Sequence, residues 1–423
     1  MLDTRIRGNV RTASMLLVFA LRVSLTDSVL PVAVAASEAP GSSSVTTQID
    51  LPLKQWVALE APPPHSGKGI PSHNKHVSAA YHPPSGRIYF TGGDYPGGGG
   101  FTTDSYRQET WSLSIAERFA TPGDSAAGWR LEYPYCGPAG QVQPKHPDHV
   151  GWVWDPKRSL FYLIPGVMEM TTEANCPGET PDKQPNAGFN PWHMMSFDPM
   201  TRRWAVLGSG APGPDAADTW QTVLDPVTDT LIRFGMTMRV NRYSLAKQQW
   251  TVHRMAGASI WKDYLAADIE GRAIYAIDGL GGRLHRYNID SGSFADLGPV
   301  PEGPIGRTNV TYLAWDSLNK TLFWHKEGTA FFAYHPQTRT WETLPITSSV
   351  PGVTAKGRLL IYDPGQNVLF LYGGSDGGTP YIFLYRYGLG SGAPSRSGTA
   401  PSRINGAVDR TEQSRETPAD RHC

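Results

Sequence analysis

The stretch IYDPGQNVLFLYGGSD, residues 361–376, contains an apolar segment, a polar turn and a second apolar segment that ends at two glycines. The turn follows Asp363, whose carboxylate can accept hydrogen bonds from the amides of the turn. Short apolar segments on either side of such a turn predict a β-hairpin. The same pattern recurs along the chain, so we interpret this hairpin as one copy of a repeat.

Five other hairpins share this pattern, and Asp, or His in the first copy, stands before the turn in each. They are YHPPSGRIYFTGG (81–93), WDPKRSLFYLIPG (154–166), LDPVTDTLIRFG (224–235), ADIEGRAIYAIDG (267–279) and WDSLNKTLFWHKEG (315–328). The first five of the six hairpins are followed by a second strand pair whose last strand starts at Trp or Phe. These pairs are TWSLSI (110–115) with GWRLEY (128–133) around a longer turn, HMMSFDPMTRRWAVL (193–207), RVNRYSLAKQQWTV (239–252), RLHRYNIDSGSFADL (283–297) and AFFAYHPQTRTWETL (330–344).

Four short antiparallel strands in a repeat of roughly 45 residues are typical of a β-propeller blade. The sixth copy lacks a Trp strand after residue 385, but LKQWVALEAPPP (53–64) has the pattern of the fourth strands elsewhere. The sequence therefore predicts an all-β, six-bladed propeller over residues 51–388, whose last blade is closed by an N-terminal strand. We expect the blades at about residues 76–133, 148–208, 217–253, 261–298, 308–345 and 355–388, with strand 53–60 completing the sixth.

The repeat resembles the kelch family and the related galactose-oxidase-like propellers. Gly92-Gly93 and Gly373-Gly374 match the kelch double glycine, and the later tryptophan of the motif is matched by Trp129, Trp204, Trp250 and Trp341. Only the first and last blades keep the double glycine, so the resemblance is to a divergent member. It implies the propeller fold and leaves the activity open, because this fold hosts many functions.

The copper site of galactose-oxidase-like enzymes includes a Tyr-His pair, which has two counterparts here. Tyr81-His82 and Tyr334-His335 both stand before hairpin turns, on the face opposite the one expected to hold a site. We therefore transfer no copper ligand from the family.

Composition and charge exclude some function classes. Apolar residues make up 39% of the chain and aromatic residues 11%, which is enough for a large core, and 45 Gly and 36 Pro indicate many turns. Lys and Arg number 38 and balance 38 Asp and Glu without a basic stripe, so we expect no nucleic-acid partner. No apolar run reaches the approximately 18 residues that span a bilayer, so we expect no stable membrane span, and we expect a monomer.

The N-terminus resembles an export signal. Arg5, Arg7 and Arg11 precede an apolar segment, and small residues follow at 33–36. We expect residues 1–46 to be a signal and flexible leader and the protein to be secreted or periplasmic; the simpler alternative is a leader that stays uncleaved. The Ser-, Gly- and Pro-rich residues 390–423 are predicted to be a disordered tail.

Long insertions gather on one face of the predicted ring. Residues 91–109 lie inside blade one, 134–149 join blades one and two, and 165–193 lie inside blade two. Long segments on a rigid scaffold commonly carry binding residues, and we expect loop contacts from Tyr95, Tyr106 and Trp192. In an oxidising compartment Cys136 and Cys176 can form a disulfide between two insertions, leaving Cys423 unpaired; otherwise all three are free thiols.

Residues just before the innermost strands are predicted to surround the channel mouth on this face. The expected ligand-binding set is Lys75, His76, Asp148, His149, Lys262, Arg307, Asn309 and Lys356. A divalent metal is a possible cofactor, with His76, His146 and His149 as its ligands. The simpler interpretation is that these polar residues line a water-filled opening.

Two functions fit these patterns. The first is an exported binding module that holds a glycan, peptide or protein ligand on the face of the long insertions. The alternative is a metal-dependent enzyme of the oxidase or lyase type with a histidine-lined site. The sequence contains no complete catalytic motif, which favours the first, and it does not name the ligand.

Overall fold

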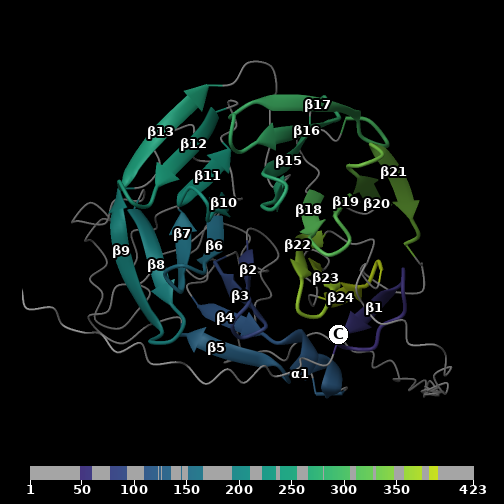
Figure 1. The fold of residues 1–423 in the computed structure, drawn as a ribbon. Coiled ribbons are helices and arrows are strands. Elements are labelled where there is room, and N and C mark those ends of the chain that lie inside the picture. The colour runs from purple at the N-terminus through teal and green to yellow at the C-terminus, as the bar shows by residue number, and fades with distance from the viewer. Residues whose placement is uncertain are drawn as a thin grey trace, which may run out of the picture. The chain divides into compact units, whose positions relative to one another are not determined.

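The computed structural model describes residues 48–59, 77–92, 109–121, 123–124, 126–134, 144, 151–164, 193–209, 222–234, 239–254, 265–279, 281–304, 311–326, 330–346, 357–373 and 381–388. All of them belong to one unit, Thr46–Cys423. They form six four-stranded antiparallel sheets arranged around a central axis, with β2, β6, β10, β18 and β22 among the innermost strands (Figure 1). The predicted six-bladed propeller is confirmed.

In blades one to five the strands follow one another outward in chain order as a simple meander, whereas in blade six the outermost strand is the N-terminal β1. Blade one contains β2 (Ser78–His82), β3 (Arg87–Thr91), β4 (Thr110–Leu113) and β5 (Trp129–Tyr133), and blade two contains β6 (Gly151–Asp155), β7 (Leu160–Ile164), β8 (His193–Asp198) and β9 (Arg203–Ser209). Blade three contains β10 (Thr222–Asp225), β11 (Thr230–Phe234), β12 (Arg239–Ser244) and β13 (Gln249–Arg254), and blade four contains β14 (Leu265–Asp268), β15 (Ala273–Asp278), β16 (Arg283–Asn288) and β17 (Phe294–Pro299). Blade five contains β18 (Thr311–Asp316), β19 (Thr321–Lys326), β20 (Ala330–His335) and β21 (Thr340–Leu344), and blade six contains β22 (Gly357–Asp363), β23 (Val368–Gly373), β24 (Tyr381–Tyr385) and β1 (Trp56–Leu59).

The N-terminal strand β1 completes blade six, as the sequence predicts. It pairs antiparallel with β24, from Trp56 opposite Tyr385 to Leu59 opposite Ile382. Pairing with β1 covers the edge of β24 that would otherwise be free to pair with another chain.

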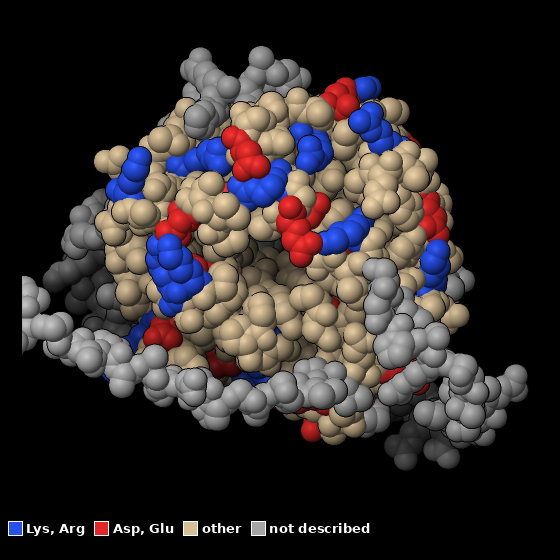
Figure 2. Space-filling model, in the orientation of Figure 1, with Lys and Arg blue, Asp and Glu red and all other residues tan. Residues whose placement is uncertain are grey.

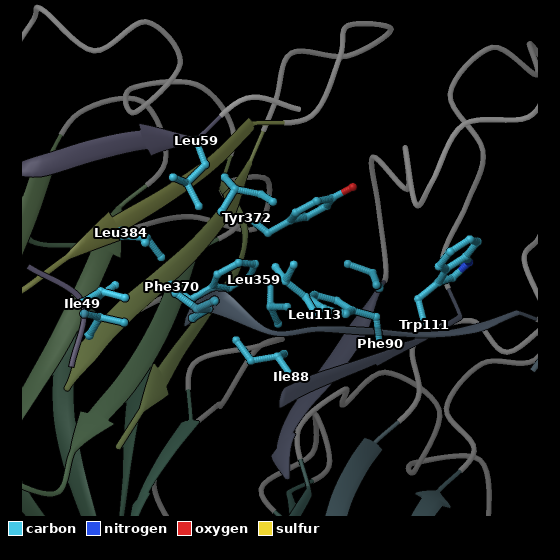
Figure 3. Close-up of a cluster of buried hydrophobic side chains, with 14 of the residues drawn as sticks. Ile49, Leu59, Ile88, Phe90, Trp111, Leu113, Leu359, Phe370, Tyr372 and Leu384 are labelled. Atoms are coloured by element: carbon cyan, nitrogen blue, oxygen red, sulfur yellow. The ribbon is translucent and has the colours of Figure 1, made fainter. Parts of the chain in front are cut away.

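A buried apolar cluster joins blade six to blade one. Leu59, Tyr372 and Leu384 of blade six lie beside Ile88 and Phe90 of blade one (Figure 3). Phe90, Tyr372 and Leu384 are no more than 1% exposed. The contact between the first and last blades is therefore as well packed as a protein interior.

The hairpin turns share one backbone geometry. The residue directly before the second strand has a positive φ in nine of them: Gly86, Ser159, Arg202, Asp229, Gln248, Arg272, Lys320, Arg339 and Asn367. The predicted carboxylate contacts are also present: Asp155 Oδ1 accepts from the amide of Lys157 at 2.8 Å, and Asp363 Oδ1 accepts from that of Gly365 at 2.9 Å. The Asp side chain before these turns therefore helps to fix the turn, and the turn fixes the strand register.

The described residues contain one helix, which the sequence reading missed. The connection after β4 was expected to be a longer turn, but Ile115–Ala120 forms α1. Ser114 caps this helix by accepting a hydrogen bond from the amide of Glu117 at 3.2 Å. The Ser-x-x-Glu spacing is a capping-box signal that identifies the helix start. No helix among the described residues is long and apolar enough to cross a membrane.

Candidate functional site

The two faces of the ring differ in how the strands are connected. On the face that we call the turn face, short hairpin turns join the first strand to the second and, in blades two to five, the third to the fourth. On the opposite face, the loop face, the connections after β3, β5 and β7 run from Thr91 to Thr110, from Tyr133 to Gly151 and from Ile164 to His193. The long connections are therefore concentrated on the loop face of blades one and two.

The site residues predicted from sequence all fall outside the described residues. These are Lys75, His76, Tyr95, Tyr106, Cys136, His146, Asp148, His149, Cys176, Trp192, Lys262, Arg307, Asn309 and Lys356. The ligand-binding set at the channel mouth, the loop contacts, the metal site and the disulfide therefore stay predictions. Among the described residues, no group of three or more His, Cys, Asp or Glu side chains is placed to hold a metal ion.

The described residues of the innermost strands line the channel between the loop face, where the mouth is predicted, and the turn face. All six innermost strands line a central cavity of about 410 Å³. Its described lining residues are Val77, Ser78, Ala79, Ala80, Tyr81, Trp152, Val153, Trp154, Thr222, Val223, Leu224, Leu265, Ala266, Ala267, Ile269, Tyr312, Leu359, Leu360 and Ile361. None of these is Asp, Glu, Lys, Arg or His, so the described channel wall carries no charged side chain. Figure 2 shows the hollow at the centre of the ring, with acidic and basic side chains around it.

On the turn face, aromatic side chains connect four pairs of neighbouring blades. In these cases the last but one residue of the first strand of one blade reaches the preceding blade around the ring. Trp154 lies edge-on to His82 with ring centroids 4.2 Å apart, and Trp315 stacks on Tyr275 at 5.5 Å. Tyr81 and Tyr362 interact with the carboxylates of Asp363 and Asp316, respectively.

In blades three and four the equivalent residues are Leu224 and Ala267, and arginine ion pairs make the connection instead. Arg158 of blade two donates to Asp229 of blade three at 2.6 Å from each of two nitrogens. Arg272 of blade four donates to Asp225 of blade three, with Nη2 to Oδ2 at 2.8 Å. Bidentate pairs of this kind are geometrically specific, so each blade is held against its neighbour in a defined register.

These contacts shift the pKa values of the groups that make them. Hydrogen bonds from Arg158 lower the pKa of Asp229 to about 2, against a smaller opposing effect of burial. Burial opposes ionisation of Asp225, but hydrogen bonds from Arg272, Thr228 and the amide of Val227 outweigh it and lower its pKa. Both carboxylates are therefore stabilised in the ionised form by the folded ring.

Two other buried groups on the turn face are shifted towards the neutral form. Burial raises the pKa of Asp363 to about 6, although amide hydrogen bonds from Gln366 and Gly365 and a contact with Tyr81 partly offset it. Burial also lowers the pKa of His82 to about 4. His82 Nδ1 lies 2.6 Å from Ser85 Oγ, so this ring is held within its own turn.

The two Tyr-His pairs are structural, as their positions before hairpin turns indicate. Tyr81 contacts Asp363 and His82 contacts Trp154, so the first pair joins three blades. His335 lies 3.3 Å from Glu342 Oε2, which accepts a hydrogen bond from the Tyr387 hydroxyl at 2.5 Å. Neither pair lines the loop face, and the structure gives no reason to place copper at them.

Buried hydroxyl groups collect at the loop-face end of blade one, which the sequence reading missed. Thr91 lies opposite Thr110, and Thr110 lies opposite Tyr133, on three neighbouring strands. The three side chains are at most 1% exposed, and their hydroxyls have no hydrogen-bond partner among the described residues. Buried polar groups are nearly always satisfied, so this end of blade one is a candidate for contact with a ligand or with other parts of the chain. The sequence signal is the pair of threonines that flank residues 92–109.

No protein-family model matches the chain, and no curated protein matches its sequence.

Proposed function

We propose that the protein is an exported binding module, a divergent kelch-like propeller that holds a glycan, peptide or protein ligand on its loop face. The observation that carries this proposal is the difference between the faces. Short turns with one repeated geometry close the first hairpin of each blade on the turn face, whereas the loop face of blades one and two carries residues 92–109, 134–150 and 165–192. Long connections on a rigid scaffold are the usual place for recognition.

Two further observations support it. The interblade contacts on the turn face fix the scaffold, and a fixed scaffold reduces the entropy lost on binding. The buried hydroxyls of Thr91, Thr110 and Tyr133 lie at the ends of the strands that flank two of the long connections. A polar ligand is the kind of partner that such groups favour.

The test is a binding screen with paired variants. The full-length protein is applied to a glycan array and to a displayed peptide library. In one variant residues 166–191 are replaced by a short Gly-Ser linker, and in another residues 93–108 are replaced in the same way. The matched control is Met200→Ser, which changes a side chain that is 85% exposed in the β8–β9 turn on the turn face.

We expect at least one loop replacement to abolish binding while the unfolding midpoint stays within a few degrees of the wild-type value. The Met200→Ser variant should bind as the wild type does. The proposal fails if no glycan or peptide binds, or if both loop replacements bind normally. Export is tested separately, by whether the chain appears outside the cytoplasm with its N-terminal residues removed.

A metal-dependent enzyme is the second candidate, and one arrangement favours it. The inner strands β2 and β6 are neighbours in the ring, and the sequence places His76 shortly before the first and Asp148-His149 shortly before the second. Imidazole and carboxylate groups suit divalent metals. Metal analysis of the purified protein tests this candidate: a stoichiometric metal, with a lower unfolding midpoint after chelation, supports it, and metal-free protein with an unchanged midpoint removes it.

A further inference from the structure

The central channel is a second candidate binding site, separate from the connections of the loop face. Its cavity of about 410 Å³ lies within the usual range of small-molecule sites. The innermost strands contain four to seven residues, so at about 3.3 Å per residue they span roughly 13–23 Å. The cavity therefore has room for one small molecule between these strands.

Small side chains keep the channel open. Ala79, Ala80 and Ala267 line it and are only half-buried, and each also packs against a buried cluster between blades. Val223 is also half-buried in the lining, on β10. Larger side chains at these positions would fill the channel without changing the outer surface of the ring.

Aromatic packing makes the β6 part of the wall rigid, although Trp152 is itself only 5% exposed and belongs to a buried cluster. Trp152 stacks on Phe161 with an interplanar angle of 4° and ring centroids 4.8 Å apart, and Trp154 is held against His82. Their positions are fixed by packing before any ligand enters. Fixed aromatic walls offer contact area without an ordering cost on binding.

The chemistry of the wall selects against charge. The polar side-chain groups of the described lining are the hydroxyls of Ser78 and Thr222 at the loop end, the indoles of Trp152 and Trp154, and the phenols of Tyr81 and Tyr312. None of these residue types is charged at neutral pH. An ion that entered would lose its hydration without gaining a counter-charge from any described side chain of the wall, which is unfavourable. An apolar group would gain free energy in proportion to the area that it removes from water.

We propose that the central channel binds a neutral, apolar small molecule, such as an alkyl chain or a small aromatic compound. Any single neutral polar group of the ligand would lie towards Ser78 and Thr222, at the loop end. The ligand is recognised by a wall whose described side chains are all uncharged, so this site is independent of the ligand proposed for the loop face.

The test uses two fluorescent probes with one ring system, neutral N-phenylnaphthylamine and its charged analogue anilinonaphthalene sulfonate. Binding to the full-length protein is measured by fluorescence titration. Ala80→Phe and Ala267→Phe fill the channel, and Ala205→Phe places the same side chain at an exposed position on β9 as the control. Val223→Thr is a milder variant that keeps the side-chain volume and lowers the apolar character of the wall.

We expect the neutral probe to bind with one site per chain, at least tenfold more tightly than the sulfonate. The two filling variants should weaken that binding tenfold or more, Val223→Thr should weaken it several-fold, and Ala205→Phe should leave it unchanged. If a filling variant does not fold, the titration of Val223→Thr and a rise of the wild-type unfolding midpoint with probe concentration decide the matter. Equal affinity for both probes, absence of saturable binding, or wild-type affinity in every channel variant overturns the proposal.

Discussion

The ring of Trp56 in β1 lies 4.9 Å from that of Tyr385 in β24, although more than three hundred residues separate them along the chain. Trp56 also lies 4.9 Å from Phe331 of blade five and is only 4% exposed. One side chain from the N-terminal strand therefore packs against two blades formed near the end of the repeat. This contact closes the ring without a covalent bond.

Removing that side chain should destabilise the whole ring. Trp56→Ala deletes a large buried group, and we expect the free energy of unfolding to fall by about 3–5 kcal/mol. Leu53→Ala is the control, because Leu53 is 44% exposed just before the same strand, and its effect should be below about 1 kcal/mol. Urea unfolding measures both, and equal effects would show that Trp56 does not anchor the closure.

The buried and exposed ion pairs between blades should differ sharply. Arg272 and Lys320 occupy equivalent turn positions in blades four and five, with φ of 52° and 51°. Arg272 pairs with the fully buried Asp225, whereas Lys320 pairs with the exposed Glu270. Arg272→Ala leaves a buried carboxylate unpaired and should lower stability by about 3 kcal/mol.

Lys320→Ala removes an exposed pair and should leave the unfolding midpoint unchanged within error. Because both substitutions place alanine at the same backbone geometry, the difference between them reports the side-chain ion pairs, which for Arg272 include Asp290 as well as Asp225. The comparison contradicts this account if the two variants unfold at the same urea concentration.

The pH dependence of stability should contain two opposing contributions. Asp363 has a folded pKa of about 6, above its usual 3.8, so its contribution is fully present below pH 3.8 and is lost as the pH rises through about 6. His82 has a folded pKa of about 4, below its usual 6.5, so its contribution is present above pH 6.5 and is lost as the pH falls through about 4. Between about pH 4 and 6 the two slopes oppose each other.

Single substitutions should separate these slopes. Asp363→Asn keeps the shape of the side chain and should stabilise the protein at pH 7 by about 1–3 kcal/mol. Its stability should then increase with pH between about 4 and 6 more steeply than that of the wild type. His82→Asn should give the opposite change of slope. Unfolding measured at several pH values checks both, and parallel curves for all three proteins would rule out these assignments.

At two turn residues with positive φ, we expect substitutions to change stability in opposite directions. Gly86 has φ 62°, and an added Cβ would have no heavy atom of a neighbour closer than 4.0 Å, so Gly86→Ala should lose about 1 kcal/mol through backbone strain alone. Gln248 is exposed with φ 53°, and Gln248→Gly should gain up to about 1 kcal/mol. Thermal unfolding of the two variants should show shifts in opposite directions, and shifts of the same sign would contradict the strain argument.

The repeat made much of the fold predictable. The strand–turn–strand pattern, the Asp before the turn and the N-terminal strand that contains Trp56 are local signals. They were enough to predict six blades and the closure of the ring. The interblade ion pairs were not predictable in this way. Arg158 and Asp229 are 71 residues apart, and they meet only because the ring brings the turns of blades two and three together.

The candidate site was less accessible to sequence reasoning for a related reason. A strand pattern shows which side chains lie on the same face of a strand, but it does not show how far the six inner strands lie from the axis of the ring. Ala80, Trp154 and Val223 each resemble ordinary core residues, and only the assembled ring shows that they line one channel whose described side chains are uncharged. The polar residues expected at the channel mouth lie outside the described residues, so that part of the site stays a prediction.

The most direct measurement of the closed ring compares two chains, one starting at residue 47 and one at residue 61, with a synthetic peptide of residues 47–60 added to the second. We predict that the shorter chain unfolds at a clearly lower temperature, because it exposes the edge of β24, and that the peptide restores the midpoint at one copy per chain. A peptide with Ala in place of Trp56 should fail to restore it. Identical midpoints for the two chains in the absence of peptide would contradict the account.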